Sequence, residues 1–181
     1  YLSDDFVNTR FDFYGKTLTG QPEMRARWKR GVQLVEGALG EAVGEIYVAK
    51  HFPPQAKERM DVLVHWLIEA YRESITNLTW MTEETKKKAL IKLSKFNPKI
   101  GYPSKWKDYS SIEISRDDLV TNVANVSSWE FDYHANKIGA PIDRDEWHMT
   151  PQTVNAYYNP GLNEIVFPAA ILQPPFFSPE A

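Results

Sequence analysis

Apolar residues recur at three- and four-residue intervals over two long stretches, and this spacing constrains the fold more than any other feature of the sequence. The first stretch contains Trp28, Val32, Val35, Leu39, Val43 and Ile46. The second stretch follows the helix-breaking letters "HFPP" and contains Met60, Leu63, Leu67, Tyr71, Ile75 and Leu78. Pro22 suits the first turn of the earlier helix. The pattern predicts two long amphipathic helices whose apolar stripes pack together.

A third, shorter helix is predicted after Thr82, because a threonine side chain can cap the first turn. Glu83 and Glu84 would then lie beside the positive end of the helix dipole, and Asn97 with Pro98 would end the helix. Its buried side is expected to consist of Ala89, Leu90, Leu93 and Phe96.

The letters "NPKIGYPSKW" interrupt the helical pattern with two prolines and a glycine, and we place a domain boundary there. This divides the chain into residues 1–98 and residues 99–181. Beyond the boundary, Ser115 and Asp118 resemble a capping box with the shorter acid, which predicts a fourth helix. Its apolar positions are Leu119, Val120, Val123, Val126 and Phe131.

The pattern changes near the end of the chain, where "TVNAYY" and "NEIVFP" are short β-prone runs joined by the turn letters "NPGL". They predict a β-hairpin over residues 153–168. Pro168, Pro174 and Pro175 oppose further ladder pairing, so an extended, irregular exit is expected after it. The predicted fold class is therefore mainly α (α+β), with packed amphipathic helices followed by a C-terminal hairpin.

Composition excludes several functions. A net charge of −3 and a pI near 5.8 provide no basic face for nucleic acid. No window has the roughly 18 to 20 continuous apolar residues of a membrane span, and the letters "YLSDDFVNTRFDFYGKTL" lack the regions of a signal peptide, so we expect a soluble chain. Zero cysteines exclude disulfides, thiolate metal sites and cysteine nucleophiles.

Four histidines are the candidate metal or acid–base residues, and none has a convincing companion. His65 is expected at the edge of the core with a hydrogen-bonded neighbour, and Glu130 with His134 is expected to be a solvated helical pair. His51 falls in a predicted loop, and His148 precedes the hairpin. No His-Glu-x-x-His pattern, phosphate-binding glycine loop or Gly-x-Ser-x-Gly turn is present.

The hairpin has two possible uses when only its residues are considered. An edge strand has free N–H and C=O groups that can pair with an extended peptide, and the Asn155 amide can both donate and accept. Alternatively, the strand docks into a sheet and the apolar tail fills a core. The residues alone leave both interpretations open.

The letters "VNAYYNPGLNEIVFPAAILQPPFF" resemble the segment before the zinc helix in the neprilysin-like family of zinc metalloendopeptidases, which includes endothelin-converting enzyme and bacterial oligopeptidase O. "RWKRGVQLVEGALGEAVGEIYV", "LTWMTEETKKKALIKL" and "KIGYP" are similar to further blocks of that family, in order and spacing. Vertebrate members carry a cysteine where this chain has Gly31, which points to a bacterial, disulfide-free member.

The resemblance implies a two-lobed peptidase in which residues 1–98 belong to a helical lobe over the peptide chamber and residues 99–181 begin a thermolysin-like catalytic lobe. Asn155 and Ala156 would bind the substrate backbone, and Tyr157 would line the same site. The zinc ligands and the catalytic glutamate would lie further along the polypeptide. We thus expect zinc in the full-length enzyme and an inactive, zinc-free fragment here.

The partners implied are peptide substrates and the remainder of the catalytic lobe. Two alternatives remain: a non-catalytic helical module that binds peptides, and a structural domain that self-associates through an exposed strand edge. A His-Glu-x-x-His helix in the continuing polypeptide would distinguish the peptidase from both.

Overall fold

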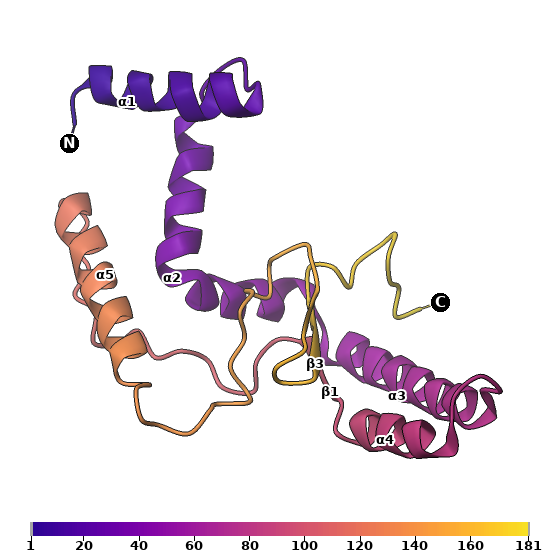
Figure 1. Cartoon of the computed structure of the whole chain (residues 1–181). Helices are drawn as coiled ribbons and strands as arrows, with labels where there is room; N and C mark the ends of the chain where they lie inside the picture. The colour runs from indigo at the N-terminus through magenta and orange to yellow at the C-terminus, as the bar shows by residue number, and fades with distance from the viewer. Residues whose placement is uncertain (1, 181) are drawn as a thin grey trace. The chain divides into compact units, whose positions relative to one another are not determined.

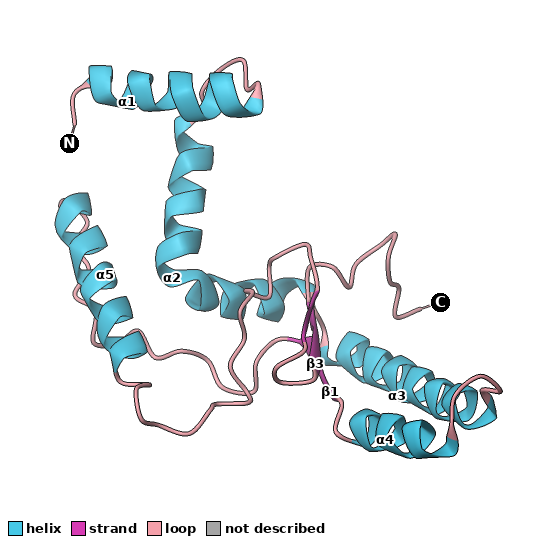
Figure 2. Ribbon diagram, in the orientation of Figure 1, coloured by secondary structure: helices cyan, strands magenta, loops and turns pink. Residues whose placement is uncertain are grey.

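The computed structural model describes residues 2–180 and is mainly helical with one small sheet (Figures 1 and 2). The helices are α1 (Asp4–Arg10), the π-helical η1 (Phe11–Thr17), α2 (Arg27–His51), α3 (Pro54–Asn77), α4 (Glu83–Ser94) and α5 (Leu119–Ala135). The strands are β1 (Asn97–Gly101), β2 (Tyr157–Asn159) and β3 (Glu164–Pro168). The predicted fold class is confirmed. Among the described residues, none of the helices is both long enough and apolar enough to cross a membrane.

The chain forms two compact units that interleave along the sequence. One contains the chain up to Gly40 together with Asp108–Ala140, and the other contains Glu41–Lys107 together with the chain from Pro141 onward. The division falls within α2, directly after Leu39 departs from helical geometry with φ −132° and ψ 37°. These two units are defined by the contacts within this chain. The predicted boundary near Lys99 instead separates the two lobes of a longer protein, and it stays a prediction.

The first unit shows two corrections to the predicted helix starts. Pro22 lies in a non-helical segment, and α2 begins only at Arg27, so Pro22 is not a first-turn residue. Asp118, rather than Ser115, is the N-cap of α5, and its side chain accepts from the Thr121 N–H at 3.0 Å. Ser115 instead accepts from the Asp117 N–H through its hydroxyl. Asp118 is thus the capping residue of α5.

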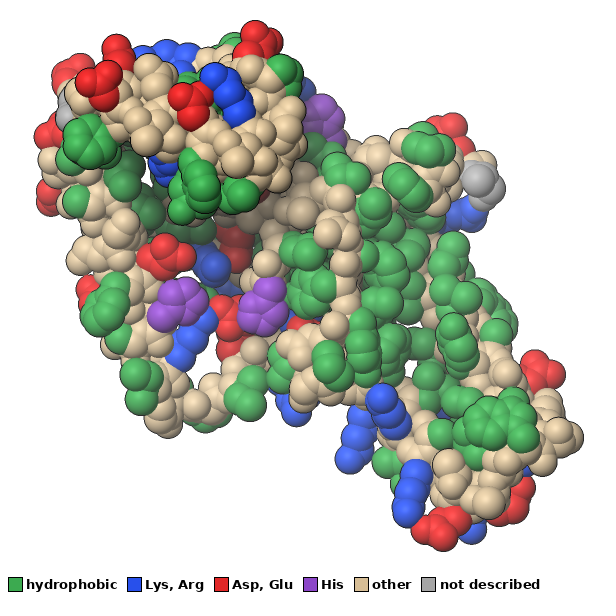
Figure 3. Space-filling model, turned by 45° about the horizontal axis from the view of Figure 1, so that its top comes forward, with side chains coloured by type: hydrophobic (Ala, Val, Ile, Leu, Met, Phe, Trp, Pro, Cys, Tyr) green, Lys and Arg blue, Asp and Glu red, His purple; other side chains and the backbone are tan. Residues whose placement is uncertain are grey.

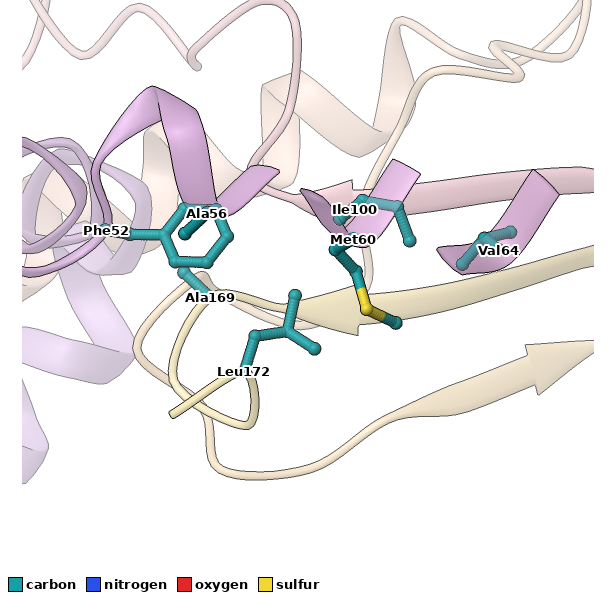
Figure 4. Close-up of a cluster of buried hydrophobic side chains, with 7 residues drawn as sticks. All are labelled: Phe52, Ala56, Met60, Val64, Ile100, Ala169 and Leu172. Atoms are coloured by element: carbon teal, nitrogen blue, oxygen red, sulfur yellow. The ribbon is translucent and has the colours of Figure 1, made fainter. Parts of the chain in front are cut away.

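The core of the second unit lies where α3 meets the sheet. Figure 4 shows its buried members, which are Phe52, Ala56, Met60, Val64, Ile100, Ala169 and Leu172. Three of these occupy every fourth position of α3, so one stripe of that helix faces β1 and the segment after β3. Burial of this stripe removes apolar surface from water, which is the main driving force for packing here.

The apolar stripes are buried less completely than predicted. Trp28, Val32 and Val35 are exposed, although the predicted stripe on this helix implied that they are buried. Figure 3 shows hydrophobic side chains, in green, at the surface around α3 and α4. Leu67 and Tyr71 are among the exposed residues, and they line an apolar groove between α3, α4 and the sheet. α4 itself starts as predicted, since the Thr82 hydroxyl accepts from the Thr85 N–H at 3.3 Å.

The sheet has the strand order β1–β3–β2. β2 and β3 form the predicted antiparallel hairpin, although the first strand begins only at Tyr157. The parallel pairing of β1 with β3 was not predicted, because Asn97 and Pro98 were interpreted only as a helix stop. No described residue after Pro168 is in a strand, which agrees with the expected irregular exit. β3 is therefore central, and β2 lies at an edge.

Candidate functional site

The predicted substrate-binding residues lie together at the start of the edge strand β2. Asn155 and Ala156 directly precede the strand, and Tyr157 is its first residue. The Asn155 N–H donates to the Thr153 carbonyl at 3.0 Å, and the Asn155 side-chain Oδ1 accepts from the Ala156 N–H at 2.8 Å. These local bonds form a compact turn with an exposed asparagine side chain.

The Asn155 amide is partly engaged by its own neighbour. Its Oδ1 already holds the Ala156 N–H, whereas its Nδ2 has no hydrogen-bond partner within residues 2–180. Because an amide NH₂ carries two donors, the free end of this side chain can donate to a carbonyl oxygen of a bound molecule. Donation is thus the available role for this side chain.

The outer side of β2 is open. β3 pairs with β2 along one side, and the part of the chain described here places no strand on the other side. In a strand, backbone N–H and C=O groups point alternately to both sides, so an edge strand presents unpaired groups of both kinds. An extended peptide can pair with such an edge irrespective of its side chains.

Tyr157 is half-buried and anchors the start of β2. Its hydroxyl accepts from the His148 N–H at 3.0 Å, and the two rings lie 6.0 Å apart between centroids. Burial raises the pKa of Tyr157, and the nearby charges of Glu164 and Glu146 act in the same direction, while the His148 N–H opposes them. The phenol is therefore a neutral hydrogen-bonding group at physiological pH, not a base.

A buried ion pair lies in the same sheet and was missed by the sequence reasoning. Lys99 on β1 and Glu164 on β3 are 8% and 0% exposed, and their Nζ and Oε2 atoms are 2.7 Å apart. The only indication of this ion pair in the sequence was one charged residue within each of the runs "NPKIG" and "NEIVFP", whose other residues carry no charge. Charged side chains are rarely buried unless they are paired.

The histidines are dispersed over the described residues. His51 is the last residue of α2 rather than part of a loop, and His65 is exposed beside Trp66 rather than at the core edge, so both predictions are wrong. Glu130 and His134 are both exposed on α5, as expected. Within residues 2–180, no group of three or more histidine, aspartate or glutamate side chains is placed to hold a metal ion.

Comparison with known proteins defines the family. Two family models, both described as "Peptidase family M13", match residues 1–103 and residues 155–181. The first match covers more than half of the chain, so this chain belongs to peptidase family M13. The second match begins at Asn155, the first of the predicted substrate-binding residues.

Individual relatives agree with this assignment. The neutral endopeptidase of Lactobacillus helveticus is 38% identical over 179 residues, which are 98% of this chain and 28% of that protein. Mouse neprilysin is 34% identical over 185 residues, covering 98% of this chain and 24% of that protein. The zinc metalloprotease Zmp1 of Mycobacterium tuberculosis, solved with an inhibitor, has a TM-score of 0.91 at 59% identity, covering 99% of this chain and 27% of that chain.

The resemblance to the neprilysin-like family is thereby confirmed. The chain spans about a quarter of the length of the relatives it matches. The comparisons thus identify the family, while the roles of individual residues in this chain stay predictions.

Proposed function

We propose that the whole protein is a zinc-dependent metalloendopeptidase and that this chain supplies the strand that holds the peptide substrate. The family assignment supports peptide hydrolysis, and relatives are named as a neutral endopeptidase and a zinc metalloprotease. The observation that carries the role of this chain is the open edge of β2 next to the free Asn155 amide donor.

In this proposal, a substrate backbone pairs with β2 as an added strand. Asn155 Nδ2 donates to a substrate carbonyl, Ala156 lets the backbone approach closely, and Tyr157 lines the site. Residues 1–98 belong to the helical lobe, and residues 99–181 begin the catalytic lobe. Fixing the peptide in one orientation makes the subsequent attack on its carbonyl nearly unimolecular.

In this proposal, the residues of this chain bind and orient the peptide but do not hold the metal. We assign the zinc ligands to the remainder of the polypeptide. This chain alone is accordingly expected to lack peptidase activity, whereas the full-length enzyme should lose activity with a chelator and recover it with added zinc.

The test is peptide cleavage by the full-length enzyme carrying Asn155→Ala. Loss of a hydrogen-bond partner at a buried contact costs about 1 to 3 kcal/mol. The variant should therefore lose this amount of transition-state stabilisation, calculated as RT ln of the ratio of wild-type to variant kcat/KM. Asn8→Ala, which removes an exposed asparagine side chain on α1, is the matched control and should leave kcat/KM unchanged. Equal kinetics for the two variants would remove Asn155 from the site. A full-length protein that binds peptides without cleaving them would instead favour a binding module.

A further inference from the structure

The Lys99–Glu164 ion pair is poorly suited to a purely stabilising role. Removing both charges from water carries a large cost that the attraction between them repays only with excellent geometry and complete hydrogen bonding. Here neither carboxylate oxygen of the fully buried Glu164 has a hydrogen-bond partner of good geometry within residues 2–180, although Oε2 lies 2.7 Å from the Lys99 Nζ. Two well-packed apolar side chains would serve stability equally well. The pair therefore calls for another role.

The strand register places both members of this ion pair on the same face of the sheet. Lys99 lies opposite Val166, which lies opposite Tyr157, so the three residues form one row across the strands. Glu164 belongs to the row two residues away, on the same face. The alternate residues Ile100 and Phe167 face the core on the α3 side. The ion pair thus lies on the face of the sheet opposite the one that packs against α3.

Lys99 also connects the sheet to the loop before β2. Its Nζ donates to the Glu146 carbonyl at 2.9 Å, in addition to contacting Glu164. Two residues further along, the His148 N–H donates to the Tyr157 hydroxyl at 3.0 Å. Trp147, between these two contacts, is only 6% exposed. The loop is thus attached to β1 at one point and to β2 at another.

We propose that Lys99 and Glu164 are positioning residues for the substrate-binding strand. Glu164 orients the Lys99 ammonium, and this ammonium holds the loop at the Glu146 carbonyl. The loop in turn fixes Tyr157 and the start of β2. An ammonium group has three donors, so it can hold a carboxylate and a carbonyl together, which no apolar side chain can do. Asn155 and Ala156 lie two residues and one residue before the fixed tyrosine. This inference rests on the proposed function of β2.

The decisive variant is the double substitution Lys99→Met with Glu164→Met in the full-length enzyme. Lys99→Met alone leaves a buried carboxylate unpaired and should destabilise the protein, which would obscure any effect on substrate binding. The double variant removes both charges with little change in volume, so its unfolding midpoint should stay near that of the wild type. It nevertheless loses the contact between Lys99 and the loop.

The expected result is a split between stability and substrate binding. The kcat/KM for an internally quenched peptide should fall by about 10- to 100-fold, because a misplacement on the order of 1 Å of the groups that orient the substrate can cost about 100-fold in rate. Amide hydrogen exchange over residues 146–159 should accelerate in the unliganded protein. The control is Lys88→Met with Glu84→Met, an equally short pair at 2.7 Å that is exposed on α4. This control should change neither quantity.

Wild-type kcat/KM and wild-type exchange in the double variant would overturn the proposal. If the wild-type enzyme cleaves no peptide, the proposed function fails, and the exchange measurement alone decides whether the ion pair positions the loop. If the double variant does not fold, Tyr157→Phe replaces it, since this change removes only the hydroxyl that accepts from His148. Unchanged exchange over residues 146–148 in Tyr157→Phe would then overturn the proposal.

Discussion

Gly101 ends β1 at a position where any side chain should be costly. Its φ of +82° lies in the left-handed region, which L-residues other than glycine rarely adopt. A Cβ built on Gly101 would lie 2.5 Å from Phe52 Cε1 and 3.3 Å from two further atoms of that ring. Phe52 is 2% exposed in the core, so its ring has little room to move. Gly101→Ala therefore combines backbone strain with overpacking.

The magnitude follows from these two contributions. The left-handed conformation costs an alanine about 1 to 2 kcal/mol and overpacking costs about 1 to 3 kcal/mol, so Gly101→Ala should lower the free energy of unfolding by about 2 to 5 kcal/mol. The Gly101 carbonyl accepts from the Ala169 N–H at 2.8 Å, so a shift of this residue would also disturb the segment after β3.

Gly139→Ala is the matched control, because it separates the two contributions. Gly139 has a nearly identical φ of +81°, but a Cβ added there would have no atom within 4 Å. This control should cost only the backbone contribution of about 1 to 2 kcal/mol. Urea unfolding of the full-length protein would measure both variants. Equal losses would show that the predicted clash with Phe52 is absent, and a Gly101→Ala loss below about 1 kcal/mol would refute both contributions.

Two further predictions concern the core and the start of α5. Met60→Ala should lower the free energy of unfolding by about 2 to 5 kcal/mol, because Met60 is only 7% exposed. Leu63→Ala is the control and should cost much less, because Leu63 is 43% exposed. Equal losses in urea unfolding would contradict the assignment of Met60 to the core. Hydrogen bonds from the Thr121 hydroxyl and N–H lower the pKa of Asp118. The cap is therefore fully present above the unfolded pKa of about 3.9 and is lost as pH falls below it. Asp118→Asn should abolish this pH dependence. The measurement is hydrogen exchange over residues 119–123, compared between the variant and the wild type at each pH. If the variant keeps the pH dependence, another group is responsible for it.

The sequence alone was sufficient where structure depends on local spacing. The helical character of α3, the Thr82 cap of α4 and the turn letters between β2 and β3 each depend on a few neighbouring residues, so their effect is visible in the order of the letters. The stripe of α3 that is buried was not predicted correctly, because it consists of Ala56, Met60 and Val64, and only Met60 belongs to the predicted stripe. The candidate site residues Asn155, Ala156 and Tyr157 were found by resemblance, because their letters match a family segment. Their role in substrate binding stays a prediction.

Only the tertiary structure decided which residues meet across long separations. β1 pairs with β3 more than sixty residues away, and no local pattern in "NPKIG" indicates that partner. The burial of Lys99 likewise depends on Glu164 and on the Glu146 carbonyl, which lie far along the chain. Periodicity reports which side of an element is apolar, but the partner that covers it, or that neutralises a buried charge, is selected by the folded chain as a whole.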